Sequence, residues 1–141
     1  MNKGKDRMSA KEYRQTEQKK PSKYHNIKTE VDGILFDSKA ESFRYKDLKL
    51  MEGAGLISDL KLQPVYELIP SFIRNGRKQR ATTYRADFSY VEKGETIVED
   101  VKGKATEVFC IKWKLFNYIY PLMTLRVNWV NHKKYKDSKE V

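Results

Sequence analysis

The chain has 141 residues, which suits one domain with a buried core. Its formal net charge of +10 predicts a polyanionic partner, nucleic acid before an anionic membrane surface. A single cysteine, Cys110, excludes an intramolecular disulfide and a cysteine-based zinc site, and its apolar neighbours predict a core position. No run approaches the ~20 apolar residues of a membrane span, and no apolar stretch follows the basic N-terminus as in a secretory signal. We therefore expect an intracellular, cytoplasmic protein that does not enter a membrane.

The two ends of the chain are basic and poor in apolar residues. Residues 1–23 hold eight Lys or Arg against three Asp or Glu, which predicts a flexible basic arm. This arm either tracks phosphates or only aids solubility. A single folded domain is expected over residues 24–132, followed by a basic tail over 133–141.

In chain order, the first predicted element is a short hairpin from Thr29 to Phe36 around Asp32-Gly33. A helix follows from Asp37-Ser38 to about Glu52, and the glycines after it end it. Its predicted apolar stripe consists of Ala40, Phe43, Leu50, Met51 and Ala54. The stretch from Leu60 leads into the next predicted strand, Val65–Ile69.

The second half begins with a turn at Asn75-Gly76, a strong hairpin signal. Two strands joined by Lys93-Gly94 follow, running over Tyr84–Tyr90 and Ile97–Gly103. A second helix is expected from Thr106 to Tyr120, and a last strand from Leu125 to Val130. This order predicts an α/β protein with a mixed sheet and helices on its faces.

The Lys93-Gly94 hairpin brings two acids together. If these two residues form the loop, Asp87 lies directly opposite Asp100, and Lys102 shares their face because side chains alternate along a strand. Like charges opposite each other destabilise a sheet, so a cation is expected between the carboxylates.

Two alternatives remain open for this hairpin. Lys102 can form a simple salt bridge with Asp87, with both side chains solvated. A register slip of one residue would place either Glu99 or Val101 opposite Asp87 instead. In the regular strand, Glu99 faces away from Asp100 and ranks below it as a metal ligand.

Asp87 and Asp100-x-Lys102, in an α-β-β-β-α-β order, resemble the PD-(D/E)xK nuclease superfamily, which includes restriction endonucleases and Holliday-junction resolvases. The chain is most similar to a small phage-borne branch of that superfamily. The matching segments are Asp32-Gly33, Phe36-Asp37-Ser38, Glu41, Leu62-Gln63-Pro64, Ala86-Asp87-Phe88 and Val98 to Gly103. One departure is Ala86, which stands where the superfamily motif has its proline. The resemblance implies a restriction-endonuclease-like core.

The resemblance also implies a catalytic site. Asp87, Asp100 and the backbone carbonyl of Val101 would bind Mg²⁺, with Mn²⁺ as a substitute. Lys102 would orient or deprotonate the attacking water, or offset charge on the phosphate. Arg85, expected opposite Lys102, would favour its neutral amine. Glu41 would hold a metal-bound water or a second metal, although a capping box with Ser38 explains this residue structurally.

Further basic side chains are candidates for DNA contacts. The hairpin around Asn75-Gly76 carries Arg74, Arg77, Lys78 and Arg80, whose guanidinium and ammonium groups suit phosphates. On the second helix, Lys112, Lys114 and Tyr118 resemble substrate-contacting positions of some relatives, although packing over an aromatic face explains the lysines equally well. Gln63 is a candidate neighbour of the site.

These features predict a metal-dependent DNA endonuclease of phage replication, recombination or packaging, acting in the bacterial host. A structure-selective enzyme similar to a Holliday-junction resolvase is the favoured version, and a homodimer is expected by analogy with resolvases. The alternative is a non-catalytic nucleic-acid-binding module on the same fold. That alternative explains the charge but not the acids, and an RNA substrate remains open.

Overall fold

The computed structural model describes residues 27–130 and 135–137, so the predicted N-terminal arm lies outside the described residues. Its elements, in chain order, are β1 (Thr29–Val31), β2 (Ile34–Phe36), α2 (Lys39–Gly53), β3 (Ile57–Leu62), β4 (Val65–Ile69), β5 (Phe72–Arg74), β6 (Arg77–Gln79), β7 (Thr82–Arg85), β8 (Phe88–Glu92), β9 (Glu95–Lys102), α3 (Glu107–Ile119), β10 (Met123–Trp129) and β11 (Tyr135–Asp137).

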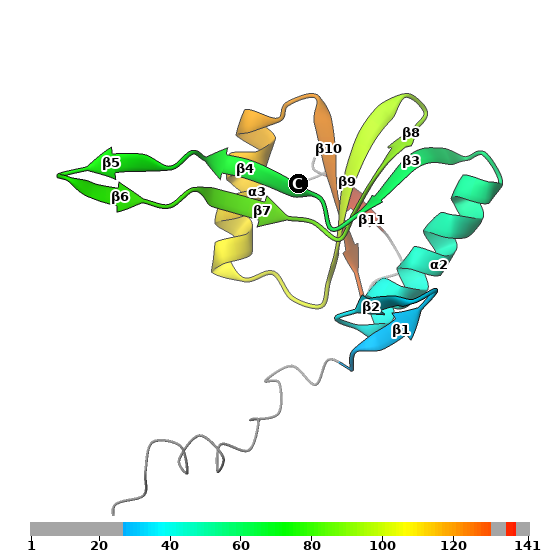
Figure 1. Cartoon of the computed structure of the whole chain (residues 1–141). Helices are drawn as coiled ribbons and strands as arrows, with labels where there is room; N and C mark the ends of the chain where they lie inside the picture. Colours follow the sequence, from blue (N-terminus) through cyan, green and yellow to red (C-terminus); the bar gives the residue numbers. More distant parts are fainter. Residues whose placement is uncertain (1–26, 131–134, 138–141) are drawn as a thin grey trace, which may run out of the picture.

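A five-stranded sheet forms the centre of the protein, in the order β11-β10-β9-β8-β3. β9 and β10 run parallel, and the other neighbouring pairs are antiparallel, so the predicted mixed sheet is confirmed. Three two-stranded pairs complete the structure: β1-β2, β4-β7 and β5-β6 (Figure 1). The coarse α/β class is therefore correct.

The two helices cover opposite faces of this sheet, as the alternation along β9 requires. On one face, Ile97 packs with Tyr45 and Leu48 of α2. On the other face, Val98 packs with Phe109 and Phe116 of α3. Because both faces are covered, charged side chains in the middle of β9 are removed from water.

The predicted apolar stripe of α2 is largely wrong, although Met51 packs against the core. Phe43 is 61% exposed and Leu50 is 74% exposed, whereas the buried residues of the helix are Ser42, Arg44, Tyr45 and Leu48. Hydrophobicity does not identify this face because the buried stripe includes a serine, a tyrosine and an arginine, and the arginine is paired with a buried acid of β9.

The predicted strands that precede the Lys93-Gly94 hairpin also differ from the structure. β3 was missed because its pairing with β8 is interrupted between Ser58 and Lys61, with Asp59 at φ 55° in the left-handed region. Val65–Ile69 forms a strand as predicted, but it pairs with β7 outside the central sheet. The predicted strand Tyr84–Tyr90 is likewise divided into β7 and β8.

The three predicted hairpin turns are present. Each has positive φ at both central residues, 52° and 74° at Asp32-Gly33, 51° and 71° at Asn75-Gly76, and 50° and 80° at Lys93-Gly94. These values belong to type I′ turns, whose twist matches that of the flanking strands.

The C-terminal part is close to the prediction, with two exceptions. α3 begins after its N-cap Thr106 and ends at Ile119, as expected. Cys110 is exposed, so its predicted core position is wrong; the apolar residues around it lie on two sides of the helix. Within the segment predicted as a tail, Tyr135–Asp137 form β11 against β10. Neither helix in the described ranges is long and apolar enough to cross a membrane.

Candidate functional site

The backbone of Asp87 lies where the chain leaves the β4-β7 ribbon and joins the central sheet. Its N–H donates to the carbonyl of Glu99 at 3.1 Å, and its own carbonyl accepts from the N–H of Gln63 at 2.9 Å. The register of the hairpin runs from Glu92↔Glu95 to Phe88↔Glu99, so the predicted pairing is confirmed and the next position brings Asp87 to Asp100. The site is therefore built on backbone that is hydrogen-bonded on both sides.

Asp100 is the buried acid of this site, with 3% of its surface exposed. Its Oδ2 accepts from the Tyr84 hydroxyl at 2.6 Å and forms an ion pair with Lys102 Nζ at 3.0 Å. The ammonium also lies over the ring of Phe109, 4.7 Å from its centroid. Lys102 is thus held beside Asp100, and the salt bridge with Asp87 considered from the sequence is replaced by this one.

Asp87 completes the acidic pair. Its Oδ2 accepts from the N–H of Val101 at 2.7 Å. Burial, followed by a hydrogen bond with Asp100 and the charge of Asp100, raises the pKa of Asp87 to about 9. At neutral pH and without a cation, Asp87 is therefore protonated, because burial and the neighbouring Asp100 disfavour its charged form.

Glu41 approaches the pair from the first turn of α2. Ser38 Oγ accepts from the Glu41 N–H at 3.2 Å and donates to Glu41 Oε1 at 3.0 Å, so the predicted helix cap is present. Burial raises the pKa of Glu41 most, and the charges of Asp37 and Asp100 raise it further. Glu41 is therefore both a cap and part of the acidic surroundings of Asp100.

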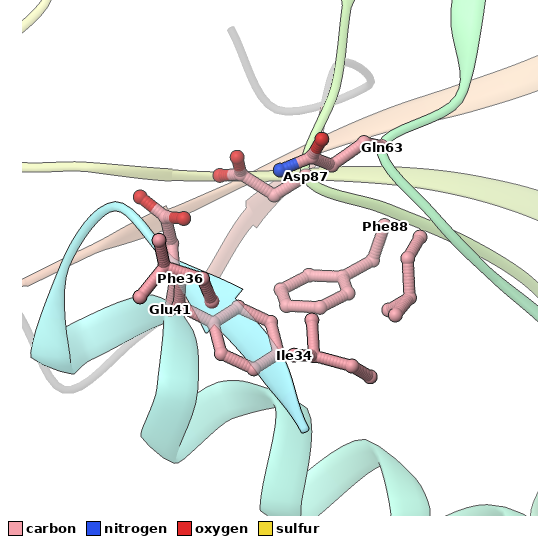
Figure 2. Close-up of a pocket in the computed structure, with 8 residues that line it drawn as sticks. Ile34, Phe36, Glu41, Gln63, Asp87 and Phe88 are labelled. Atoms are coloured by element: carbon pink, nitrogen blue, oxygen red, sulfur yellow. The ribbon is translucent and has the colours of Figure 1, made fainter. Parts of the chain in front are cut away.

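A cavity of about 160 Å³ opens beside Glu41 and Asp87. Figure 2 shows the carboxyl groups of Glu41 and Asp87 pointing toward the same space, with the amide of Gln63 next to Asp87. Apolar side chains form the rest of the wall: Ile34, Leu35, Phe36, Leu62 and Phe88. Gln63 is exposed, at φ 49°, and is confirmed as a neighbour of Asp87.

The donor set fits one hard cation rather than a dense metal cluster. Over residues 27–130 and 135–137, no three His, Cys, Asp or Glu side chains are grouped for metal binding. Asp87 nevertheless lies beside Asp100 and holds a proton that a divalent cation would replace, and Mg²⁺ commonly uses one or two carboxylates with several waters. The remaining ligands would be the Val101 carbonyl and water.

A model of one protein family matches residues 21–137, and its description is a protein of unknown function, DUF1064. The match covers most of the 141 residues. The chain belongs to this family. No curated relative and no solved structure matches the chain.

In this DUF1064 protein, Glu99 lies on the opposite face from Asp100, as predicted, and is fully buried. It accepts from Arg44 Nε at 2.5 Å, from Arg44 Nη2 at 3.0 Å and from the Tyr90 hydroxyl at 2.5 Å. Arg126 in turn donates to Tyr90 at 3.1 Å and to Glu92 at 3.0 Å. The charge of Glu99 is therefore compensated by Arg44 within the protein, and this face does not require a metal.

Several predicted residues lie away from the acids. Arg85 is exposed and pairs with Val65 in the ribbon, so its expected place beside Lys102 is wrong. On α3, Lys114 and Tyr118 are exposed while Lys112 is half-buried. The residues of the basic hairpin, Arg74, Arg77, Lys78 and Arg80, are all exposed.

Sequence reasoning missed three residues that organise the site: Tyr84, Arg44 and Tyr90. Tyr84 and Tyr90 lie at the two ends of the segment that carries Asp87, and each donates to one of the β9 acids. Two buried acids next to each other in β9 are a signal that each needs a donor. The sequence does not indicate which donor serves which acid, because β7 leaves the sheet before Asp87.

Proposed function

We propose that this protein is a metal-dependent DNA endonuclease that hydrolyses phosphodiester bonds. The observation that carries this proposal is the acidic pair of Asp87 and Asp100 in a buried site, with Lys102 3.0 Å from Asp100. Burial and the neighbouring Asp100 raise the pKa of Asp87 to about 9. Strongly raised carboxyl pKa values beside a cavity are typical of functional sites rather than of stabilising ones.

The arrangement of the central sheet supports the same proposal. The elements that build the sheet and its helical cover occur in the order α2, β3, β8, β9, α3, β10 and β11, and the β4 to β7 segment is inserted between β3 and β8. Up to β10, this order is similar to the α-β-β-β-α-β order of PD-(D/E)xK nucleases, and Asp87 and Asp100-x-Lys102 would be the residues of that motif.

Asp87, Asp100 and the Val101 carbonyl would hold Mg²⁺, with Mn²⁺ as a substitute. The ion supplies Lewis-acid polarisation of the phosphate and lowers the pKa of a bound water. Tyr84 keeps Asp100 in one orientation through its 2.6 Å hydrogen bond. Val101 does the same for Asp87 at 2.7 Å, so both carboxylates are preorganised.

Lys102 would act on the reacting phosphate. Its ammonium has three N–H donors, of which one serves Asp100, and its side chain is partly open to water. It can therefore donate to a phosphate oxygen and offset the charge that develops there. Glu41, which lines the cavity together with Asp87, would position the attacking water.

The substrate preference we propose is branched DNA, cut as by a Holliday-junction resolvase in phage replication, recombination or packaging. The net charge of +10 supports a polyanionic substrate. A homodimer would provide the two sites needed to cut two strands.

The test is a cleavage assay on labelled single-stranded, duplex, flap and four-way-junction DNA, with Mg²⁺, Mn²⁺ or EDTA. We expect metal-dependent cutting that is lost in Asp100→Ala and in Lys102→Ala, while Lys102→Ala still binds DNA. Lys104→Ala is the matched control, since Lys104 is an exposed lysine two residues further along the chain. Binding without cutting under every metal would instead favour a non-catalytic nucleic-acid-binding module.

A further inference from the structure

The ribbon of β4-β7 and β5-β6 projects from the body of the protein and ends in a basic hairpin (Figure 1). Its base is packed on α3, where the rings of Tyr66 and Phe116 meet edge-on at 5.2 Å and the Tyr120 hydroxyl donates to the Glu67 carbonyl at 2.8 Å. At the tip, every residue of β5 and β6 is exposed. The fold thus holds this hairpin clear of the sheet on a fixed base.

The charges of the tip oppose its own folding. Arg74 lies directly opposite Arg77 in the pair next to the turn. Like charges in this position destabilise a hairpin, and an isolated two-stranded hairpin is only marginally stable. The segment 68–86 contains no acidic residue that would relieve the repulsion. A polyanionic partner would relieve it, which gives these arginines a role in binding.

The tip carries cations on both faces. The register pairs Phe72 with Gln79 and Ile73 with Lys78, so Lys78 lies on the face opposite to Arg74 and Arg77. Ile73 is 75% exposed beside Lys78. A partner that matches this pattern presents negative charge on both sides of the ribbon, as the two phosphate backbones that border a nucleic-acid groove do.

The thickness of the ribbon decides which groove of a nucleic acid can hold it. A sheet with its side chains is about 10 Å thick, judged from the spacing of packed sheets. The major groove of B-form DNA is about 12 Å wide and admits a two-stranded ribbon, whereas the minor groove is about 6 Å wide. The major groove of A-form RNA is deep and too narrow for side chains to read. Duplex DNA is therefore the polyanion that fits.

We propose that the β5-β6 hairpin is a DNA-binding arm that lies in the major groove of the duplex next to the cleavage site. This inference rests on the proposed function, because it takes the substrate to be DNA. The arm starts at the site itself: the Ala86 N–H donates to the Pro64 carbonyl at 3.0 Å, one residue before Asp87. The ten or so residues from Val65 to its tip span at most about 33 Å. The arm therefore contacts DNA up to about one helical turn from the reacting phosphate.

The test measures binding separately from cutting, with Asp100→Asn protein in EDTA and a labelled duplex. The arm variant combines Arg74→Gln, Arg77→Gln and Lys78→Gln. We expect its affinity for the duplex to fall about 10- to 100-fold at low salt. The plot of log K against log salt should become less steep by about 2 to 3 units, since each lost phosphate contact removes about 0.9 from the magnitude of the slope. The matched control, Lys28→Gln, Lys46→Gln and Lys93→Gln, removes three exposed lysines from other surfaces and should change the slope by less than half as much.

Two further comparisons address the groove and the reach. Double-stranded RNA of the same sequence should bind the parent and the arm variant with nearly equal affinity. A duplex that extends only about five base pairs beyond the reacting phosphate should likewise bind the parent and the arm variant with nearly equal affinity.

A variant with Arg74→Lys and Arg77→Lys, which keeps the charge, should retain most of the salt dependence of binding. Unchanged melting temperatures would show that the variants are folded.

The outcomes separate this inference from the proposed function. If the arm variant and the lysine control bind duplex DNA with equal affinity, the β5-β6 hairpin is not a DNA-binding arm. Equal losses on DNA and RNA overturn the groove and leave a general phosphate-binding patch. If the arm variant loses DNA affinity as expected but the intact protein cuts nothing with any metal, the nuclease proposal fails and the arm stands.

Discussion

Two neighbouring residues of β9 show how the same chemistry is treated differently on the two faces of the sheet. Glu99 is fully buried and receives three hydrogen bonds, two of them from Arg44. Asp100 is almost as buried but faces a second acid, Asp87, whose pKa is raised to about 9. On the first face, Arg44 and Tyr90 compensate the charge of the buried Glu99 carboxylate within the protein. On the second face, Lys102 pairs with Asp100 at 3.0 Å, but the neighbouring Asp87 stays protonated at neutral pH unless a cation binds beside it.

This contrast is the reason for proposing a structural role for Glu99 and a functional one for Asp100. A buried ion pair with satisfied partners fixes the packing of α2 on β9, and α2 also carries Glu41 three residues before Arg44. The Glu99 face therefore positions one side of the cavity. The Asp100 face, which is electrostatically frustrated, is where the chemistry is expected, since strain of this kind is retained at functional sites.

The largest effect should come from breaking the neutralised face. Arg44→Met leaves the Glu99 carboxylate buried beside a tyrosine hydroxyl, and an uncompensated buried charge costs about 3–5 kcal/mol. We expect urea denaturation to show a loss of stability of this size. The double variant Arg44→Met with Glu99→Gln removes the charge as well and should recover more than half of it. Equal losses in the single and double variants would contradict the proposed importance of the buried charge.

The acidic pair should respond to pH in the opposite sense to a salt bridge. Asp87 has a folded pKa of about 9 against an ordinary value of 3.8. Between these values the folded protein binds a proton that the unfolded chain has lost, so stability falls as pH rises from about 4 to about 9. Asp87→Asn cannot ionise and should flatten this slope, making the variant about 1–2 kcal/mol more stable than the parent at pH 8.

Metal provides the control for this pH effect. In the proposed metal-bound state Mg²⁺ would replace the proton of Asp87, so it should stabilise the parent more at pH 8 than at pH 6 and should have little effect on Asp87→Asn. Melting curves in EDTA and in Mg²⁺ at the two pH values measure both effects. A parent protein whose stability in EDTA does not change between pH 5 and pH 8 would contradict the raised pKa of Asp87.

The sequence predicts the part of the site that depends on local geometry. The type I′ turn at Lys93-Gly94 sets the register, and the register alone brings Asp87 to Asp100 and turns Glu99 away. The N-cap of α2 is predicted for the same reason, because Ser38 and Glu41 are three residues apart. In both cases the information lies within a few residues.

Contacts between distant segments escape this reasoning. Arg44 and Glu99 are 55 positions apart, and neither the buried face of α2 nor the position of Arg85 can be derived from periodicity. The interrupted pairing of β3 hides an edge strand of the central sheet, and the departure of β7 into the ribbon hides Tyr84 as the partner of Asp100. These features depend on how whole elements pack, and a single sequence contains no direct signal for that.

The two tyrosines that serve the β9 acids offer the finest comparison between the faces. Tyr84→Phe removes one donor from Asp100, and Tyr90→Phe removes one donor from Glu99, which keeps both bonds to Arg44. Each change should cost about 1 kcal/mol of stability, the usual value of one hydrogen bond. Only Tyr84→Phe should raise the Mg²⁺ concentration needed for half-maximal cleavage rate, by about tenfold, because it would loosen a proposed metal ligand. Equal effects of the two changes on the metal requirement would mean that the two faces are not functionally distinct.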